Sequence, residues 1–225
     1  YRKNFHGGVN LAAGDIDGDG ADEILTAPLT GGGPHVSFFR SNGTKLGNLF
    51  PVESTYRGGL SLAAVDITGD GRAEIAAVPL GGRVTDVKIS DPFTRQVLVT
   101  AKPFANFRGG AELSIFQRNG VAELLASAGA GGGPQVVSIN PFTGGKGSVN
   151  VFPVPQAWRG GIVAKPITYT LTNDVSMVVS VGSLALTPDQ LATYSGTTST
   201  GTSGFSFKEQ SVVTTRGTFT AEIIS

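Results

Sequence analysis

Phe5-His6-Gly7-Gly8 is the first of four copies of an aromatic-Arg/His-Gly-Gly motif; the others are Tyr56-Arg57-Gly58-Gly59, Phe107-Arg108-Gly109-Gly110 and Trp158-Arg159-Gly160-Gly161. Each copy follows the previous one by 51 residues. A fixed period of this size specifies an array of similar units, each of which buries its apolar surface against its neighbours. We therefore expect one structural unit per motif.

Each unit is expected to contain four short strands and no helix. Apolar and β-branched runs separated by turn residues span 9–16, 23–27, 35–39 and 47–52 in the first unit, and 60–67, 74–78, 86–89 and 96–101 in the second. Four such runs in about 50 residues are typical of a four-stranded antiparallel blade of a β-propeller. The competing architecture is a solenoid, whose units are usually shorter, about 20–45 residues. The sequence thus predicts an all-β fold of propeller blades.

The C-terminal part departs from this period. After an apolar run at 175–181, residues 194–204 are rich in Ser, Thr and Gly, and 205–213 resembles a fourth strand. The predicted repeats are 5–55, 56–106, 107–157 and 158–214, followed by a partial fifth copy at 215–225. Propellers typically close with four to eight blades. About four blades plus a partial fifth therefore indicate a small ring with an overlapping strand, or part of a larger ring or assembly.

Composition excludes several classes of partner. Lys plus Arg equals Asp plus Glu at 17 each, so there is no basic field for nucleic acid. No apolar run approaches the roughly 18 residues of a spanning helix, which predicts no membrane insertion. The absence of cysteine excludes disulfides, thiolate metal sites and cysteine nucleophiles. The first residues resemble neither an initiator nor a secretion signal, so we expect the chain to begin partway through a longer precursor.

The loop between the first two strands carries spaced carboxylates, Asp15-Ile16-Asp17-Gly18-Asp19-Gly20-Ala21-Asp22-Glu23. Acidic residues at positions one, three, five and nine, with a turn-making glycine at six, gather hard oxygen ligands around one point. Ca²⁺ takes 6–8 oxygens at about 2.3–2.6 Å. We expect Ca²⁺ to be bound by Asp15, Asp17, Asp19, Glu23 and the carbonyl of Ala21. The alternative is that this Asp-Gly cluster serves only as a turn.

The later loops lose these ligands step by step. The second keeps Asp66, Asp70, Glu74 and the carbonyl of Arg72, but Thr68 stands at position three, so we expect weaker binding or none. The third keeps only Asn119 and Glu123, and the fourth has Pro166 at the first position, with Asp174 surviving. We expect these two loops to be free of metal.

Three stretches of the first unit resemble the FG-GAP repeats of integrin-type and bacterial extracellular β-propellers: Phe5-His6-Gly7-Gly8-Val9, Ala12 to Gly20, and Gly31-Gly32-Gly33-Pro34-His35-Val36. The likeness extends over residues 5–181. It implies propeller blades with Ca²⁺ in the loop between the first two strands, in secreted or surface proteins that bind partners. The lost ligands in two loops argue against calcium in every blade.

The sequence favours binding over catalysis. Both histidines lie at repeat-equivalent positions, and no acidic constellation interrupts the repeat, so we expect no enzyme; a propeller-based carbohydrate-active enzyme is the remote alternative. Two non-catalytic functions remain: a calcium-stabilised extracellular module for adhesion or recognition of glycan or protein, and a structural protomer of a surface layer or filament that assembles with copies of itself through terminal strands. Asn42-Gly43-Thr44 is a glycosylation sequon, and the Ser/Thr tract at 195–203 is a candidate for O-glycans.

Overall fold

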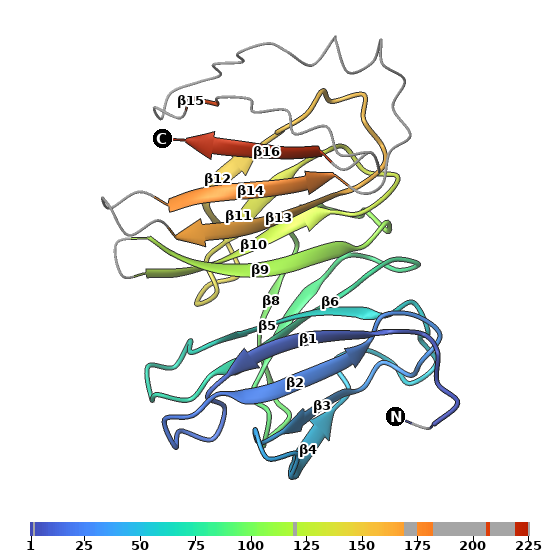
Figure 1. Ribbon diagram of the computed structural model, residues 1–225, viewed down its shortest axis with the longest axis vertical. Helices are drawn as coiled ribbons and strands as arrows, with labels where there is room; N and C mark the ends of the chain where they lie inside the picture. The colour runs from blue at the N-terminus through green and yellow to red at the C-terminus, as the bar shows by residue number, and fades with distance from the viewer. Residues whose placement is uncertain (2, 119–120, 169–174, 182–205, 208–218, 225) are drawn as a thin grey trace.

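The computed structural model describes residues 1, 3–118, 121–168, 175–181, 206–207 and 219–224, and every regular element in these ranges is a strand (Figure 1). The strands form four four-stranded antiparallel sheets. The first contains β1 (Val9–Gly14), β2 (Glu23–Pro28), β3 (Val36–Phe39) and β4 (Lys45–Leu49); the second β5 (Leu60–Val65), β6 (Glu74–Pro79), β7 (Val87–Ser90) and β8 (Val97–Ala101); the third β9 (Ala111–Arg118), β10 (Val121–Ala128), β11 (Val136–Ile139) and β12 (Lys146–Val151); the fourth β13 (Ile162–Thr168), β14 (Val175–Val181), β15 (Ser206–Phe207) and β16 (Phe219–Ile224). The all-β prediction with four-stranded antiparallel units is confirmed.

The fourth sheet corrects the predicted fifth copy. Its order is β13-β14-β16-β15, so β16 pairs with β14 on one side and with β15 on the other. Residues 219–224 therefore complete the fourth sheet as its third strand instead of starting a fifth unit. Most of the strand predicted at 205–213, and the Ser/Thr tract at 195–203, lie outside the described residues.

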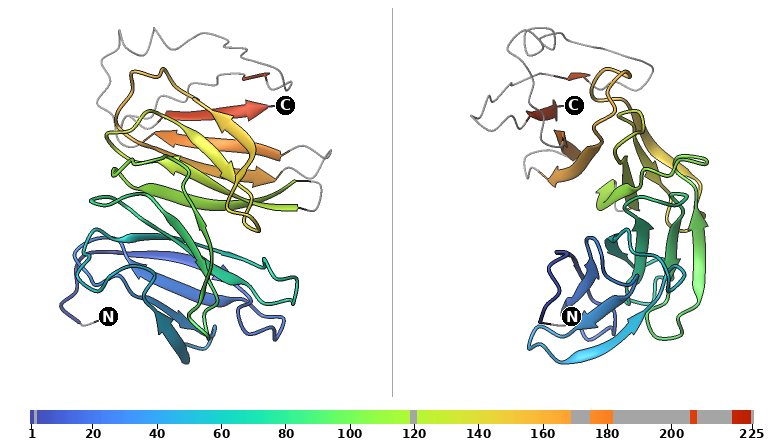
Figure 2. Two further views of the ribbon diagram at one scale, coloured as in Figure 1. Left: turned by 180° about the vertical axis from the view of Figure 1, so that it is seen from behind. Right: turned by 90° about the vertical axis from the view of Figure 1, so that its right-hand side faces the viewer.

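The sheets follow one another in chain order around an arc, with the first and fourth sheets at its two ends (Figure 2). Contacts between consecutive sheets are made chiefly by their first strands: β1 contacts β5, β5 contacts β9, and β9 contacts β13. Each later first strand also packs across the second strand of the preceding sheet, as β5 does on β2 and β9 on β6. Each sheet therefore packs on the preceding one through the same strands, as expected for units that repeat every 51 residues.

Apolar cores lie between successive sheets. Leu60 and Leu62 of β5 pack with Leu25 of the first sheet, whereas Ala63 and Val65 of the same strand pack with Leu113 of the third. This alternation follows from the two-residue period of a strand, whose neighbouring side chains point to opposite faces. The second sheet is thus covered on both sides, and β6 is buried along its whole length.

The Gly-Gly motif is the backbone joint between sheets. Gly82 N donates to Arg108 O at 2.9 Å, which links the β6–β7 loop of the second sheet to the motif of the third. The same bond occurs between the first and second sheets and between the third and fourth, as Gly31 N to Arg57 O and Gly131 N to Arg159 O. Within each of the first three sheets, the carbonyl of the second glycine accepts a hydrogen bond from the amide just after the second strand; Leu80 N, for example, donates to Gly59 O at 3.1 Å.

The second glycine of the motif is required by close packing. Gly59 and Gly110 have φ values of 83° and 81°, in the left-handed region that side chains rarely adopt. A Cβ at Gly59 would fall on the carbonyl oxygen of Leu29, and one at Gly110 on the carbonyl of Leu80, both in the preceding sheet. The backbone of each sheet therefore approaches its predecessor at a distance that only glycine permits.

We predict that Gly59→Ala destabilises the protein strongly, because it adds a clash with Leu29 O to the cost of a left-handed residue, which alone is of order 1–3 kcal/mol. Gly43→Ala is the matched control: Gly43 has φ 84°, but a Cβ there would meet nothing within 4 Å. Equilibrium denaturation of the two variants should show a clearly larger loss of unfolding free energy for Gly59→Ala. Equal losses would mean that the close approach contributes nothing.

Candidate metal site

The β1–β2 loop is shaped by the side chain of Asp15. Its Oδ1 accepts from Gly18 N at 2.7 Å, and its Oδ2 accepts from Gly20 N at 2.8 Å. Both glycines have positive φ, 80° and 86°, which turns their amides toward the same carboxylate. The alternating glycines of the sequence thus fold the loop back around its first aspartate.

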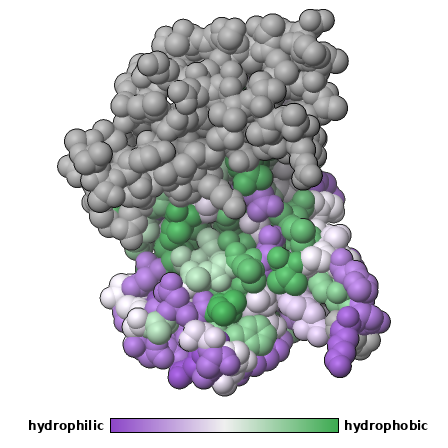
Figure 3. Space-filling model, in the orientation of Figure 1, coloured by the Kyte–Doolittle hydropathy of each residue, from purple (hydrophilic) through white to green (hydrophobic). Residues whose placement is uncertain are grey.

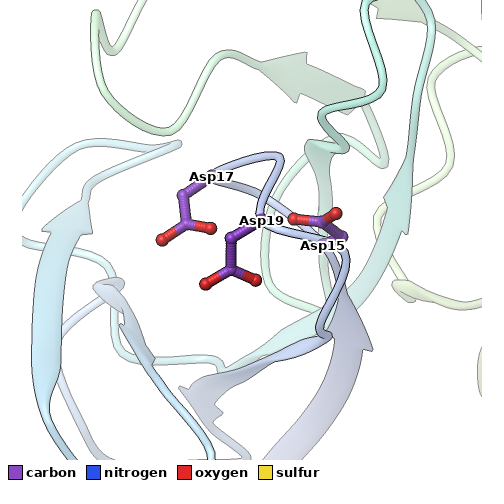
Figure 4. A group of neighbouring side chains, drawn as sticks. All are labelled: Asp15, Asp17 and Asp19. Atoms are coloured by element: carbon purple, nitrogen blue, oxygen red, sulfur yellow. The ribbon is translucent and has the colours of Figure 1, made fainter.

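Three carboxylates meet at this loop, as Figure 4 shows. Each of Asp15, Asp17 and Asp19 offers an oxygen, and these oxygens lie within 4.8 Å of one another. Asp17 Oδ1 is buried without a hydrogen-bond partner among the described residues. A buried, unpartnered carboxylate oxygen beside two further carboxylates is the donor set that a hard cation prefers.

Glu23, the last predicted carboxylate ligand, lies at the base of the loop. It is 2% exposed, and its Oε2 accepts from Ile16 N at 3.1 Å. Burial raises the pKa of Glu23, and the charges of Asp17 and Asp19 raise it further, whereas the bond from Ile16 lowers it. Glu23 is outside the three-carboxylate group, and the amide of Ala21 donates to Asp19. The structure therefore shows Glu23 as a brace for the loop, and its role as a ligand stays a prediction.

Arg40 is a member of this site that the sequence analysis missed. Its guanidinium lies 2.6 Å from Asp17 Oδ2 and 3.8 Å from Asp19 Oδ2. The pairing of β2 with β3 joins Ile24 to Phe39, so the residue after β3 lies beside the loop that precedes β2. The contact of Arg40 with the loop follows from the pairing of β2 with β3, and no spacing along the chain predicts it.

The loop between β5 and β6 is held by the same type of aspartate–amide hydrogen bonds, but it contains an arginine that the first loop lacks. Asp66 accepts from Gly69 N at 2.7 Å and Gly71 N at 3.0 Å, as Asp15 does with its two glycines. Arg72, which replaces Ala21 of the first loop, donates to Asp70 Oδ2 through Nη2 at 2.7 Å and Nε at 3.1 Å. Hydrogen bonding to Arg72 lowers the pKa of Asp70. The loop thus supplies its own cation, and the buried Glu74 accepts from Ile67 N as Glu23 does from Ile16.

In the third and fourth units, the first two strands pair over more residues than in the first two units. β9 and β10 pair as far as Arg118 and Val121, so a hairpin replaces the ion loop. Glu123 Oε2 accepts a hydrogen bond from Ser148 N of β12 at 2.9 Å, within its own sheet. Pro166 lies inside β13, opposite Met177 of β14. Asn119 and Asp174 lie outside the described residues.

One comparison with known proteins gives a match, and it lies in the first two units. Residues 15–77 match the family model of the FG-GAP-like repeat. This segment is an FG-GAP-like repeat. The match begins at the first aspartate of the first loop, includes the whole second loop and ends within β6. FG-GAP repeats are typical of extracellular proteins and often bind calcium. Searches of curated proteins and of solved structures found no match.

The other predicted sites are placed as follows. Asn42 lies in the exposed β3–β4 turn, where its Oδ1 accepts from Thr44 N at 2.9 Å. Arg57, one of the motif arginines, donates to the carbonyls of Ser54 and Tyr56. Arg159, another motif arginine, donates to the carbonyls of Gln156 and Trp158 in the same way.

We predict that Asp66→Ala destabilises the protein with or without calcium, because it leaves the amides of Thr68, Gly69 and Gly71 without their acceptor. Hydrogen bonds to a charged group contribute about 1.5–3 kcal/mol each at most, so we expect a loss of about 2 kcal/mol in this exposed loop. Asp70→Ala removes the exposed ion pair with Arg72 and leaves one backbone amide, that of Arg72, without its acceptor, so it should change stability less than Asp66→Ala. Urea denaturation in chelator measures both; a larger effect for Asp70→Ala would contradict this assignment.

Proposed function

We propose that the chain is a non-catalytic, calcium-stabilised β-propeller scaffold of an extracellular protein, which presents its surface loops to a glycan or protein partner. The observation that carries the calcium part is the group of Asp15, Asp17 and Asp19 with the unpartnered Asp17 Oδ1. The FG-GAP-like repeat over residues 15–77 supports the propeller and the extracellular location.

The charges of the first loop favour a bound cation. Two carboxylates about 5 Å apart repel by roughly 1 kcal/mol in water and by about 3 kcal/mol near a protein surface. Arg40 offsets part of this repulsion but is itself exposed, and Asp15 has no ion pair among the described residues. The three aspartates, with the carbonyl of Ala21 and with Glu23, provide the oxygen ligands for Ca²⁺, which neutralises the group when bound.

A cation here would stabilise the joint between two sheets. Asp15 O accepts from Ala73 N at 2.7 Å, which connects the first loop to the second across the interface between their sheets. The side chain of Arg72 also lies against Gly18, where a Cβ would be 2.9 Å from Arg72 Cγ. Asp15 holds Gly18 and Gly20, so any ion that fixes this carboxylate also fixes the contact with the second sheet.

We predict that Ca²⁺ raises the melting temperature. At a free concentration 100 times Kd, binding to the folded state contributes about 2.7 kcal/mol, which corresponds to roughly 5–10 °C for a chain of this size. Asp17→Asn should abolish most of the shift. Asp22→Asn is the matched control, because Asp22 is an exposed acid of the same loop outside the carboxylate group. Differential scanning calorimetry with Ca²⁺ and with chelator measures the shift; no shift for the unaltered chain overturns the calcium proposal.

We further predict a binding stoichiometry of one Ca²⁺ within residues 1–168. Arg72 already neutralises Asp70, and Thr68 supplies no carboxylate where the first loop has Asp17. Thr68→Asp combined with Arg72→Ala should add a second site, because it restores the charge pattern of the first loop. Isothermal titration calorimetry of the two proteins gives the stoichiometry; two sites in the unaltered chain would show that Arg72 does not replace the ion.

Exposed aromatic rings support a binding function. Phe50, Phe93, Phe142 and Phe152 are 43–56% exposed. Phe93 and Phe142 lie in the turns between third and fourth strands, whereas Phe50 and Phe152 directly follow fourth strands. Aromatic side chains supply large contact areas and are enriched at protein interfaces. None of the described elements is a helix long and apolar enough to cross a membrane.

Assembly with copies of the same chain is the second candidate function. β16 is paired with β14 over Phe219–Ile223 and with β15 at Ile223 and Ile224, so donation of this strand would require it to leave its own sheet. An assembly that leaves β16 in place would use other sheet edges, sheet faces or loops. Size-exclusion chromatography with light scattering distinguishes a monomeric module from a polymer.

A further inference from the structure

Every interface inside the chain has a receiving side, formed by the first two strands of the later sheet. On the second sheet, the receiving positions Leu60, Leu62 and Ile75 are 0%, 5% and 0% exposed, because they pack against the first sheet. The equivalent residues of the third sheet, Ala111, Leu113 and Leu124, are likewise buried against the second.

The same positions are uncovered on the first sheet. Val9, Leu11 and Ile24 correspond to Leu60, Leu62 and Ile75 one repeat earlier, and they are 40%, 67% and 40% exposed. In Figure 3, hydrophobic side chains gather on the face of the lower part of the molecule, where β1 and β2 lie in the same view of Figure 1. We call this surface, formed by Val9, Leu11 and Ile24, the receiving face.

The first motif also lacks, among the described residues, the hydrogen bond that later motifs accept from the preceding sheet. Arg57 O and Arg108 O each accept a glycine amide from the loop of the preceding sheet. Among the described residues, no backbone amide donates to His6 O, the corresponding carbonyl of the first motif. Gly8 keeps the left-handed φ of 72°, yet a Cβ there would meet only the side chain of Leu29 in its own sheet. The first motif thus has the geometry for a close approach that no described residue makes.

The chain reaches the first sheet by the same route as it reaches the second. Val52 lies four residues before the motif, is 8% exposed and packs in the core between the first two sheets. Tyr1 lies four residues before its own motif, donates to Thr26 Oγ1 at 3.3 Å and stacks on Phe5. Thr26 is a neighbour of the receiving face on β2, so Tyr1 lies where a segment arriving from a preceding sheet would pass.

We propose that the receiving face is one half of a fourth inter-sheet interface, and that its occupant is a further four-stranded sheet of this repeat, joined to the chain on the N-terminal side of Phe5. In all three described interfaces, the sheet that covers a receiving face is the preceding repeat of the same polypeptide. The occupant presents small and aliphatic side chains, as Ala63 and Val65 do to the third sheet, and a loop amide that donates to His6 O. This inference is independent of calcium.

The test uses the accessibility of position 11. The chain has no cysteine, so Leu11→Cys introduces a single thiol whose maleimide labelling rate reports exposure. A fusion protein that carries an extra copy of residues 56–106 directly before Phe5 preserves the 51-residue spacing and supplies the missing sheet. In the unfused protein, we expect the thiol of Leu11→Cys to be labelled at a rate within about threefold of that in the unfolded chain. In the fusion, we expect this rate to be at least tenfold lower than in the unfused protein. Val97→Cys, on the exposed β8 strand, should label equally in both proteins.

Three labelling results overturn the proposal. Protection of Leu11→Cys in the unfused chain at all concentrations would mean that the chain covers its own receiving face. Protection that increases with concentration would identify a second copy as the occupant. Undiminished labelling in the fusion would show that a repeat sheet does not bind there. As a further check on the unfused chain, Leu11→Glu should shift the melting temperature by less than 2 °C and Leu62→Glu should lower it several-fold more; a large loss for Leu11→Glu also overturns the proposal.

Discussion

The close approach of one sheet's backbone to the next depends on the second glycine of each motif. Gly59, Gly110 and Gly161 all have positive φ, and a Cβ at any of them would press into the main chain of the preceding sheet. This approach sets the distance at which Gly31, Gly82 and Gly131 donate to the motif carbonyls. It also brings β5 over β1 and β2, so that the inter-sheet cores can close. The first glycine adds a local fit, because a Cβ at Gly58 or Gly109 would collide with the ring of its own motif.

The β1–β2 and β5–β6 loops lie next to these joints and are held by a different set of contacts. Each β1–β2-type loop must satisfy several amides with one aspartate, which is why Asp15 and Asp66 make nearly identical bonds. The carboxylates that complete the turn then need a positive charge. Arg40 supplies part of it in the first loop and Arg72 supplies it in the second, from different places in the chain. A buried glutamate closes the base of both loops by accepting one backbone amide.

Most of the fold could be predicted from the sequence, because each strand pattern is repeated and the turns are marked by Gly, Asn and Pro. The aspartates that meet at the first loop could be predicted for the same reason, since their spacing is local. Arg40 could not, because its contact depends on the pairing of β2 with β3. The prediction of a partial fifth copy was wrong. Residues 219–224 have the sequence pattern of a first strand, but they pair with the free edge of β14 in the fourth sheet. Sequence pattern identifies a strand but not which of several free edges it will join.

The repeats tolerate changes in the ion loops more than changes in the motif for a physical reason. A loop's negative charge can be offset by an ion, by Arg72 as in the second unit, or removed with the loop itself, as in the hairpin between β9 and β10. Each solution leaves the strands in register. The space at Gly59 or Gly110 has no comparable substitute, because any side chain would occupy the position of a neighbouring carbonyl. The motif persists in the first sheet too, where Gly8 keeps its left-handed φ although the nearest described atoms to the position of its Cβ belong to a side chain of its own sheet and not to the backbone of a preceding one. That retained geometry is most simply explained if the first sheet, like the three that follow it, is built to receive a predecessor.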